Sequence, residues 1–312
     1  MKIAVFGVGG VGGYFGARLA QAGEDVTFIA RGDHLHAIQD NGLRVESILG
    51  DFVIQPAKAE EDPARVGVVD LVILGVKAWQ VSEVAGSLKP LVGKQTMVLP
   101  LQNGVEAPYQ LAEVLGREHV LGGLCRISVF IASPGVIRHV AIPPSLMFGE
   151  LDSRKSSRVV DLLGVFSQCQ GLAAGIPEDV NVALWEKFIF ITAVSGLGAA
   201  VRLPIGAYRG IPETRKLLMG ALKEAVFVGR ANQVNITDEI MDHTLQVIDG
   251  LPPETFASMQ NDIMNGRPSE LEYQTGTIVR MGMELSVPTP INDFLYAVLL
   301  PMERKARVTR AE

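Results

Sequence analysis

The stretch KIAVFGVGGVGGYFGARLA, residues 2–20, decides the fold of the first half of this chain. A short apolar run leads into G-x-G-x-x-G, and a segment with helical spacing follows. This motif between a strand and a helix is typical of a turn that binds a dinucleotide. Its glycines permit the bend, admit a pyrophosphate and let the helix pack closely on the strand. The alternative is a glycine-rich turn without a ligand. The residues predicted to bind are Gly7, Gly9, Gly10, Val11 and Gly12.

The sequence after this turn extends the prediction to a whole domain. Strand-like runs alternate with helical segments, which favours βαβ units and a parallel sheet. Residues 122–149 are strand-like with Pro and Gly between the runs, and we expect a hairpin added to that sheet. The runs predicted as parallel strands are 2–6, 25–29, 71–76 and 96–100.

Helical periodicity dominates from about residue 177 onward. We expect an α/β fold with an N-terminal Rossmann-type doubly wound sheet, residues 1–176, that binds the dinucleotide. A C-terminal all-helical domain, residues 177–312, would carry the substrate and the catalytic groups. The segments predicted as helices are 181–200, 213–233, one starting near Pro252, and 269–281.

Composition limits the kinds of partner. A net charge of -6 gives no general attraction for nucleic acid or anionic lipid. Cys125 and Cys169 form no C-x-x-C pair and the five histidines are scattered, so we expect no metal site and a reducing cytoplasm. No export signal precedes the first strand, and Phe188–Val201 is too short to span a bilayer, which makes it a buried helix. We therefore expect a cytoplasmic protein with no nucleic-acid or membrane partner.

The ends of the predicted strands suggest which dinucleotide binds. Arg31 follows the second strand, where an NAD-binding chain usually has an acidic residue. A guanidinium pairs well with a phosphate, so Arg31 favours NADPH through its 2'-phosphate. An exposed loop arginine is the alternative. Lys77 and Asn103 also follow strands and are expected at the same crevice, although a solvated lysine and a turn at Asn103-Gly104 would explain them equally well.

Several motifs, in order along nearly the whole chain, resemble those of the ketopantoate reductase (2-dehydropantoate 2-reductase) family. The resemblance implies reduction of 2-dehydropantoate to pantoate with NADPH, a step of pantothenate biosynthesis. The motifs are KIAVFGVGGVGGYFGARLA (residues 2–20), ARGDHLHAI, VKAWQV, LQNGVE, ALWEKF, SMQNDIMNGRPSELEY and VPTPIN.

The same resemblance assigns roles to single residues. Lys187 matches the lysine that is the general acid of the family, and Glu270 matches a substrate-side glutamate. Asn103 matches an asparagine placed near both substrate and nicotinamide. Ser258 matches a serine that binds the substrate. Arg31 matches the arginine of the 2'-phosphate, and Lys77 a lysine beside the cofactor.

A lysine suits this chemistry for reasons independent of the family. Hydride delivery to a ketone produces alkoxide character, which a cation that also donates a proton stabilises twice. An ordinary exposed helix lysine is the alternative for Lys187. For Glu270, which follows Pro268, the alternative is an acidic residue in the first turn of a helix.

One departure from the family pattern concerns the substrate. Positions four and eight after Lys187 share its helix face, and the family commonly has asparagines there. This chain has Ile191 and Ser195. Ser195 keeps a hydroxyl for the substrate, whereas Ile191 suggests a reshaped pocket. A paralogous reductase of another small 2-oxo acid therefore stays open, as does a non-catalytic NADP(H)-binding sensor. A homodimer is possible, but no motif fixes it.

Overall fold

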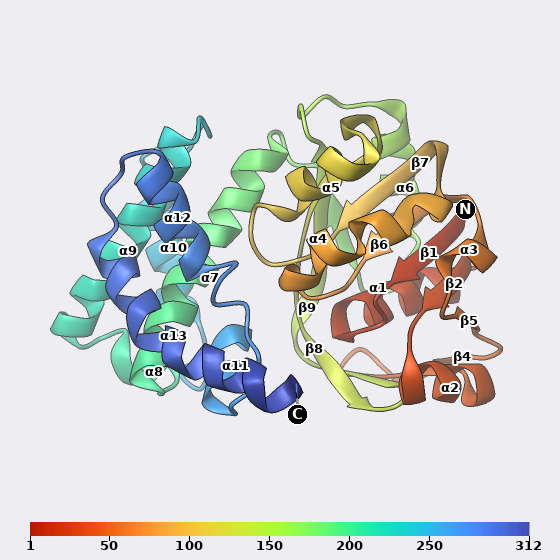
Figure 1. The fold of residues 1–312 in the computed structure, drawn as a ribbon, viewed down its shortest axis with the longest axis horizontal. Coiled ribbons are helices and arrows are strands. Elements are labelled where there is room, and N and C mark those ends of the chain that lie inside the picture. The colour runs from red at the N-terminus through yellow and green to blue at the C-terminus, as the bar shows by residue number, and fades with distance from the viewer. Residues whose placement is uncertain (312) are drawn as a thin grey trace. The chain divides into compact units, whose positions relative to one another are not determined.

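The structure, a computed structural model, describes residues 1–311, with side chains to residue 308. The chain divides into two compact units (Figure 1). Unit 1 contains Met1–Gln102 and Glu106–Ala183, and unit 2 contains Asn103–Val105 and the residues from Leu184 on. The boundary expected at 176/177 lies between β10 (Ala173–Gly175) and α7 (Val180–Val201), whereas the division falls inside α7.

The first sheet of unit 1 is the predicted doubly wound sheet. Its five strands are parallel in the order β5-β2-β1-β6-β7, so the first strand lies at the centre. The strands are β1 (Lys2–Phe6), β2 (Asp25–Ile29), β5 (Lys58–Glu60), β6 (Val69–Leu74) and β7 (Val92–Pro100). The helical segments between them are α1 (Gly10–Gln21), α2 (Gly32–Asn41), α3 (Pro63–Val66), η1 (Ala78–Gln80), α4 (Val81–Val84) and η2 (Ala85–Leu91). The Rossmann-type prediction is confirmed.

A second five-stranded sheet corrects the prediction for residues 122–149. These residues do form a long antiparallel hairpin, but it is not an extension of the parallel sheet. The edge of β9 that does not pair with β8 pairs with β3 and β10. Toward the parallel sheet there is only an isolated bridge between Val98 of β7 and Val120, the residue before β8. The strands are β3 (Leu43–Ser47), β4 (Phe52–Ile54), β8 (Leu121–Ser133), β9 (Val136–Glu150) and β10. The segments α5 (Ala107–Leu115) and η3 (Arg117–His119) precede β8, and α6 (Ser157–Ser167) lies between β9 and β10.

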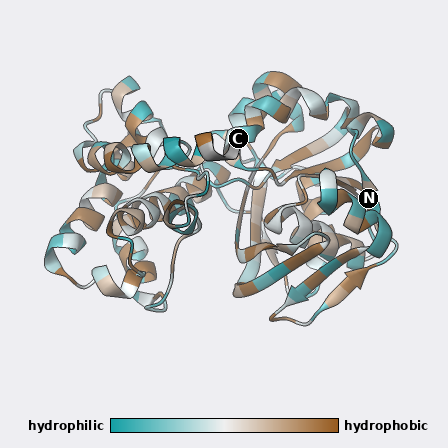
Figure 2. Ribbon diagram, turned by 60° about the horizontal axis from the view of Figure 1, so that its bottom comes forward, coloured by the Kyte–Doolittle hydropathy of each residue, from teal (hydrophilic) through white to brown (hydrophobic). Residues whose placement is uncertain are grey.

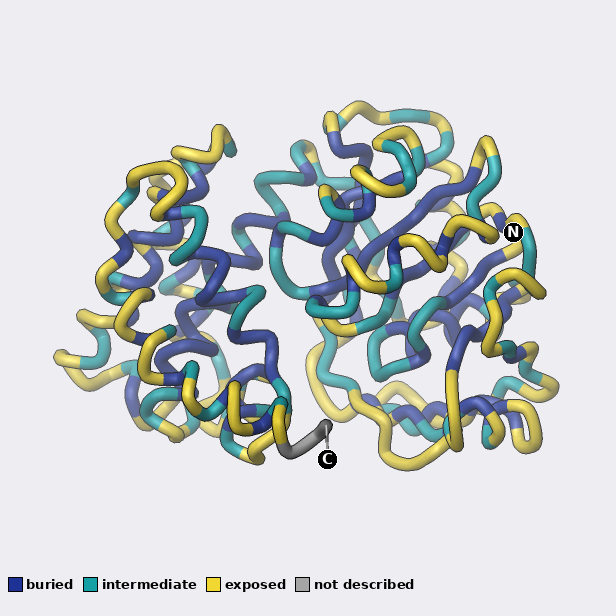
Figure 3. The backbone as a smooth tube through the Cα atoms, viewed as in Figure 1, coloured by how far each residue is buried: buried dark blue, intermediate teal, exposed yellow. Residues whose placement is uncertain are grey.

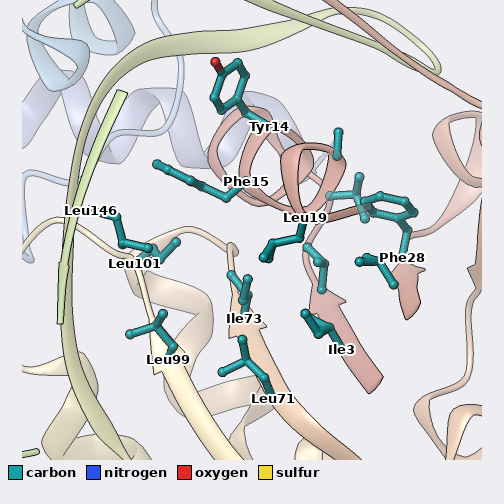
Figure 4. Close-up of a cluster of buried hydrophobic side chains, with 14 of the residues drawn as sticks. Ile3, Tyr14, Phe15, Leu19, Phe28, Leu71, Ile73, Leu99, Leu101 and Leu146 are labelled. Carbon is teal, nitrogen blue, oxygen red and sulfur yellow. The ribbon is translucent and has the colours of Figure 1, made fainter. Parts of the chain in front are cut away.

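The core of unit 1 fixes α1 on the parallel sheet. Leu19 of α1 points toward Ile3 of β1 and Ile73 of β6, Phe15 extends toward Leu146 of β9, and all five side chains are fully buried (Figure 4). Burial of each such side chain stabilises the fold by about 1.5–3 kcal/mol. The strands accordingly run as buried segments through the unit (Figure 3). This packing places the start of α1, and with it the glycine turn, at the carboxyl end of β1.

Unit 2 is helical, as predicted. Its longest apolar helix, α7, has the length and composition to cross a membrane, but most of that stretch is buried inside the structure, as in a core helix. The other helices mix hydrophilic and hydrophobic residues, which is typical of amphipathic helices around a core (Figure 2). They are α8 (Ile205–Tyr208), α9 (Pro212–Ala231), α10 (Ile240–Gly250), α11 (Ser258–Met264), α12 (Thr275–Glu284) and α13 (Pro290–Ala311).

Two predicted helix starts in unit 2 are wrong. The helix expected near Pro252 begins only at Ser258, and the helix expected from Ser269 begins at Thr275. Residues 269–274 form a turn because the N–H of Ser269 is bound by the Glu303 carboxylate and Gln274 has non-helical angles, φ -116° and ψ -92°. Glu270 therefore precedes α12, and the alternative that it is a first-turn acidic residue is wrong.

Candidate active site

Three of the four glycines in the turn, residues 7–12, are required by the fold of unit 1. Gly7 has a φ of +91°, and a Cβ there would lie 2.7 Å from the backbone nitrogen of Val76. A Cβ on Gly12 would lie 2.2 Å from the carbonyl oxygen of Gly7. A Cβ on Gly10 would lie 2.6 Å from the carbonyl oxygen of Val129. At these three positions the close approach of backbone to backbone explains the glycine.

The second glycine of the motif has no such explanation. Gly9 has a φ of -75°, which any residue adopts, and its Cβ would meet only the carbonyl oxygen of Gly75, at 3.6 Å. Gly9 is also the N-cap of α1 and contributes no side-chain hydrogen bond. The first-turn N–H groups of a helix without such a cap are available to an anion. The open space at Gly9 and the uncapped helix start fit a bound pyrophosphate.

Two cations lie at the carboxyl ends of strands next to β1. Arg31 follows β2 as the N-cap of α2 and is exposed. Among the side chains that the structure describes, its guanidinium has no hydrogen-bond or ion-pair partner. Lys77 follows β6 as the N-cap of η1, with its Nζ 5.7 Å from the ring centroid of Trp79. Both places fit a phosphate-bearing cofactor.

A histidine that the sequence did not single out lies beside the glycine turn. The Nδ1 atom of His34, on α2, accepts a hydrogen bond from the Gly135 N–H at 3.0 Å. Burial lowers the pKa of His34, and the Val8 backbone opposes that shift. Through this hydrogen bond His34 connects α2, which begins after Arg31, with the β8–β9 turn.

In unit 2 the structure brings together Asn103 and Glu270, which are far apart in the sequence. The Nδ2 atom of Asn103 donates to Oε2 of Glu270 at 3.1 Å. Gln274, which the sequence did not suggest, lies at 3.4 Å from the same oxygen through its Nε2. Gly104 has a φ of +110°, so Asn103 is also part of a turn that favours glycine. Glu270 is only 5% exposed, so its carboxylate is held by amide donors away from bulk water.

Lys187 is not an ordinary exposed helix lysine. It lies on α7 with only 9% of its surface exposed, between the buried Trp185 and Phe188. The rings of these two neighbours pack edge to face at 5.4 Å. A lysine this buried is uncommon unless its ammonium has a partner or a function.

Ser195 lies two turns beyond Lys187 on the same face of α7, about 12 Å along the helix axis. It is fully buried, and no partner for its Oγ is found among the described residues. A Cβ on the adjacent Gly196 would lie 3.2 Å from Oγ1 of Thr275. Ser195 is therefore near the start of α12, directly after Gln274.

Ser258 is not brought into this cluster by any hydrogen bond that the structure gives. It is exposed at the start of α11, while the next residue, Met259, packs into the core of unit 2. The structure thus groups Asn103 and Glu270 with Gln274, places Ser195 nearby, buries Lys187 on the same helix as Ser195, and leaves Ser258 at the surface.

Comparison with known proteins identifies the family. The model described as "Ketopantoate reductase PanE/ApbA" matches residues 3–153, and its C-terminal counterpart matches residues 179–303. The 2-dehydropantoate 2-reductase of Mesorhizobium japonicum is 30% identical over 97% of this chain and 99% of its own. The uncharacterized oxidoreductase YkpB of Bacillus subtilis is 28% identical over 96% of this chain and 98% of its own.

A solved structure agrees with these sequence matches. The PanE/ApbA family ketopantoate reductase from Ralstonia eutropha JMP134 is 31% identical and superposes with a TM-score of 0.89, covering 98% of this chain and 100% of that chain. Both halves of the chain match the family, and so does its fold. The chain therefore belongs to the ketopantoate reductase family of oxidoreductases.

Proposed function

We propose that this protein reduces 2-dehydropantoate to pantoate with NADPH. The observation that carries the proposal is the burial of Lys187 in the same unit as the Asn103–Glu270 pair. A buried lysine and a buried, amide-bound carboxylate are costly to keep in a core, and a reaction at a carbonyl group uses both. This pattern also speaks against a non-catalytic NADP(H)-binding sensor, which would need neither group.

The roles follow from the chemistry of ketone reduction. Bound NADPH supplies the hydride that the carbonyl carbon accepts. Lys187 donates a proton from its Nζ to the carbonyl oxygen, and its positive charge stabilises the developing alkoxide. Glu270 accepts a hydrogen bond from a substrate hydroxyl, while Asn103 keeps the carboxylate in place. Ser195 offers a buried hydroxyl to the substrate. Ser258, being exposed, would reach the substrate only from the surface.

The cofactor site is tested by the glycine that the fold does not explain. Gly9→Ala should leave the free energy of unfolding nearly unchanged, because its Cβ meets only ordinary contacts. The same methyl group would fill the space of the pyrophosphate, so we expect NADPH affinity to fall by at least about 10-fold. Gly12→Ala is the contrast, with an expected loss of about 1–3 kcal/mol of stability. Urea unfolding and NADPH fluorescence titration measure both. A Gly9→Ala variant with full NADPH affinity would contradict the site.

The choice of NADPH over NADH is tested at Arg31. Because the Arg31 guanidinium is exposed and available, Arg31→Ala should weaken NADPH binding by about 10- to 100-fold, the value of a charged hydrogen bond to phosphate. NADH affinity should change by less than about threefold. The exposed Arg44 of β3, which pairs with Glu46, provides a control as Arg44→Ala. Equal losses for both cofactors would refute a 2'-phosphate role.

A second candidate function differs in its substrate. Ile191 stands on the face of α7 that carries Lys187 and Ser195, where the family commonly has an asparagine. Half-burial of Ile191 makes an apolar wall available to a 2-oxo acid with fewer hydroxyls. A panel of 2-oxo acids with NADPH and with NADH tests this. The highest kcat/KM for 2-dehydropantoate supports the first function, and a higher value for an alkyl-substituted 2-oxo acid supports the second.

A further inference from the structure

Glu270 lies on a segment with no regular secondary structure, residues 269–274, between α11 and α12. The proposed function needs its carboxylate in one place, because a small misplacement of a catalytic group costs much of the rate. A backbone outside helices and sheets has to be fixed by other hydrogen bonds. The groups that bind this segment therefore matter for the position of Glu270.

The helix α13 supplies these groups at Ser269, the residue immediately before Glu270. The Glu303 carboxylate accepts the N–H of Ser269 at 2.9 Å and its hydroxyl at 2.5 Å. One turn later, Arg307 donates from Nη2 to the carbonyl oxygen of Ser269 at 3.2 Å. Its Nε lies 2.7 Å from Oε1 of Glu303. Two residues of one helix thus hold both backbone groups and the side chain of Ser269; we call these three residues the Ser269 clamp.

The Ser269 clamp attaches α13 through buried polar groups, and burying such groups costs free energy. Glu303 is only 4% exposed and Ser269 is fully buried, so a charge has been taken out of water. A well-packed apolar pair would attach α13 at least as well, because burying an ion pair costs most of what the pair gains. What the polar clamp adds is a fixed backbone direction at Ser269. That direction sets where the side chain of Glu270 begins.

We propose that Glu303, together with Arg307, is a positioning residue that acts through Ser269 to hold Glu270 within reach of Asn103. The inference rests on the role given to Glu270 in the proposed function. It assigns to α13 a part in the reaction, through the bonds that Glu303 and Arg307 make to Ser269.

The other end of α13 provides a matched control. Glu224 of α9 is 8% exposed, and its carboxylate accepts the N–H groups of Ile291 and Asn292, each at 2.9 Å. It is thus a second buried glutamate that ties α13 to the rest of unit 2 through backbone N–H groups. It does not bind the segment that carries Glu270. Glu224→Gln should therefore lower the stability of unit 2 in the same way as Glu303→Gln, without changing the position of the Glu270 carboxylate.

The experiment compares Glu303→Gln with Glu224→Gln by urea unfolding and steady-state kinetics. We expect both to lower the unfolding midpoint. Only Glu303→Gln should lower kcat/KM for the 2-oxo acid by about 10-fold, mainly through KM, with the KM for NADPH within about twofold of wild type. If Glu303→Gln does not fold, Ser269→Ala is the second variant to test. It removes one small hydroxyl and keeps the N–H bond to Glu303, so it should show part of the same KM effect.

Equal kinetics for Glu303→Gln and Glu224→Gln, or a normal KM in Ser269→Ala, would overturn the inference. A wild-type enzyme that turns over no 2-oxo acid would instead refute the proposed function. In that case crystal structures of the two glutamine variants decide the inference. Loss of the Asn103–Glu270 hydrogen bond in Glu303→Gln alone supports the clamp, and its retention in both variants contradicts it.

Discussion

Replacing Lys187 by alanine should lower kcat by about 10³-fold, because it removes both the proton donor and the positive charge at the reacting oxygen. Steady-state rates at saturating NADPH measure this loss. NADPH affinity should stay within about threefold of wild type, since the proposed role of Lys187 is at the carbonyl oxygen of the substrate and not at the cofactor. The expected result is therefore an enzyme that binds its cofactor and hardly turns over.

The control for Lys187→Ala is a lysine of the same unit without a proposed role. Lys223 is exposed on α9, with its Nζ 5.5 Å from the ring centroid of Phe227. Lys223→Ala should leave kcat within about twofold of wild type, as for most surface substitutions. A Lys187→Ala variant as active as Lys223→Ala would show that Lys187 is not the general acid.

Replacing Glu270 by glutamine should have the second largest effect. The substitution keeps the size of the side chain but removes the negative charge that two amide groups and, in the proposed function, a substrate hydroxyl share. We expect kcat/KM for the 2-oxo acid to fall by about 10²-fold, in the range found for the loss of one oriented polar group at a reacting centre. Stopped-flow or steady-state measurement of NADPH consumption gives this value.

Glu272 is the matched control for Glu270. It lies two residues further on, and its carboxylate binds the Tyr296 hydroxyl and Arg280, 2.5 Å from each. At 40% exposure it forms a surface ion pair, which contributes little to stability. Glu272→Gln should therefore keep kcat/KM within about twofold of wild type. Similar losses in the two variants would mean that charge near α12, rather than the Glu270 carboxylate itself, affects the rate.

The first sheet could be predicted from the sequence because its signals are local. Residues 2–20 contain a strand, a glycine turn and a helix in succession, and local pattern alone determines such a unit. The placement of the 122–149 hairpin could not be predicted, because its partner β3 is a short strand with polar residues and lies far away in the chain. Pairing over such a distance leaves no trace in the hydrophobic pattern of either segment.

The candidate site shows the same limit. The family motifs point to Lys187, Asn103 and Glu270, and the structure shows the hydrogen bond that joins the last two. Gln274 and Glu303 were missed because their contribution depends on which group they reach in the folded chain, not on their residue type. Gln274 reaches the Glu270 carboxylate, and Glu303 reaches the Ser269 backbone. The helix start was misplaced for the same reason. The helical pattern of residues 269–281 continues through a turn that the long-range bond to Glu303 keeps out of the helix.

The central claim is that this member of the ketopantoate reductase family reduces a 2-oxo acid with NADPH, and one assay tests it most directly. Purified protein is mixed with NADPH and 2-dehydropantoate, and the loss of NADPH is followed together with the formation of pantoate. We predict equal amounts of NADPH consumed and pantoate formed, at a rate that Lys187→Ala lowers by about 10³-fold. No consumption of NADPH with 2-dehydropantoate or with any other 2-oxo acid would contradict the account.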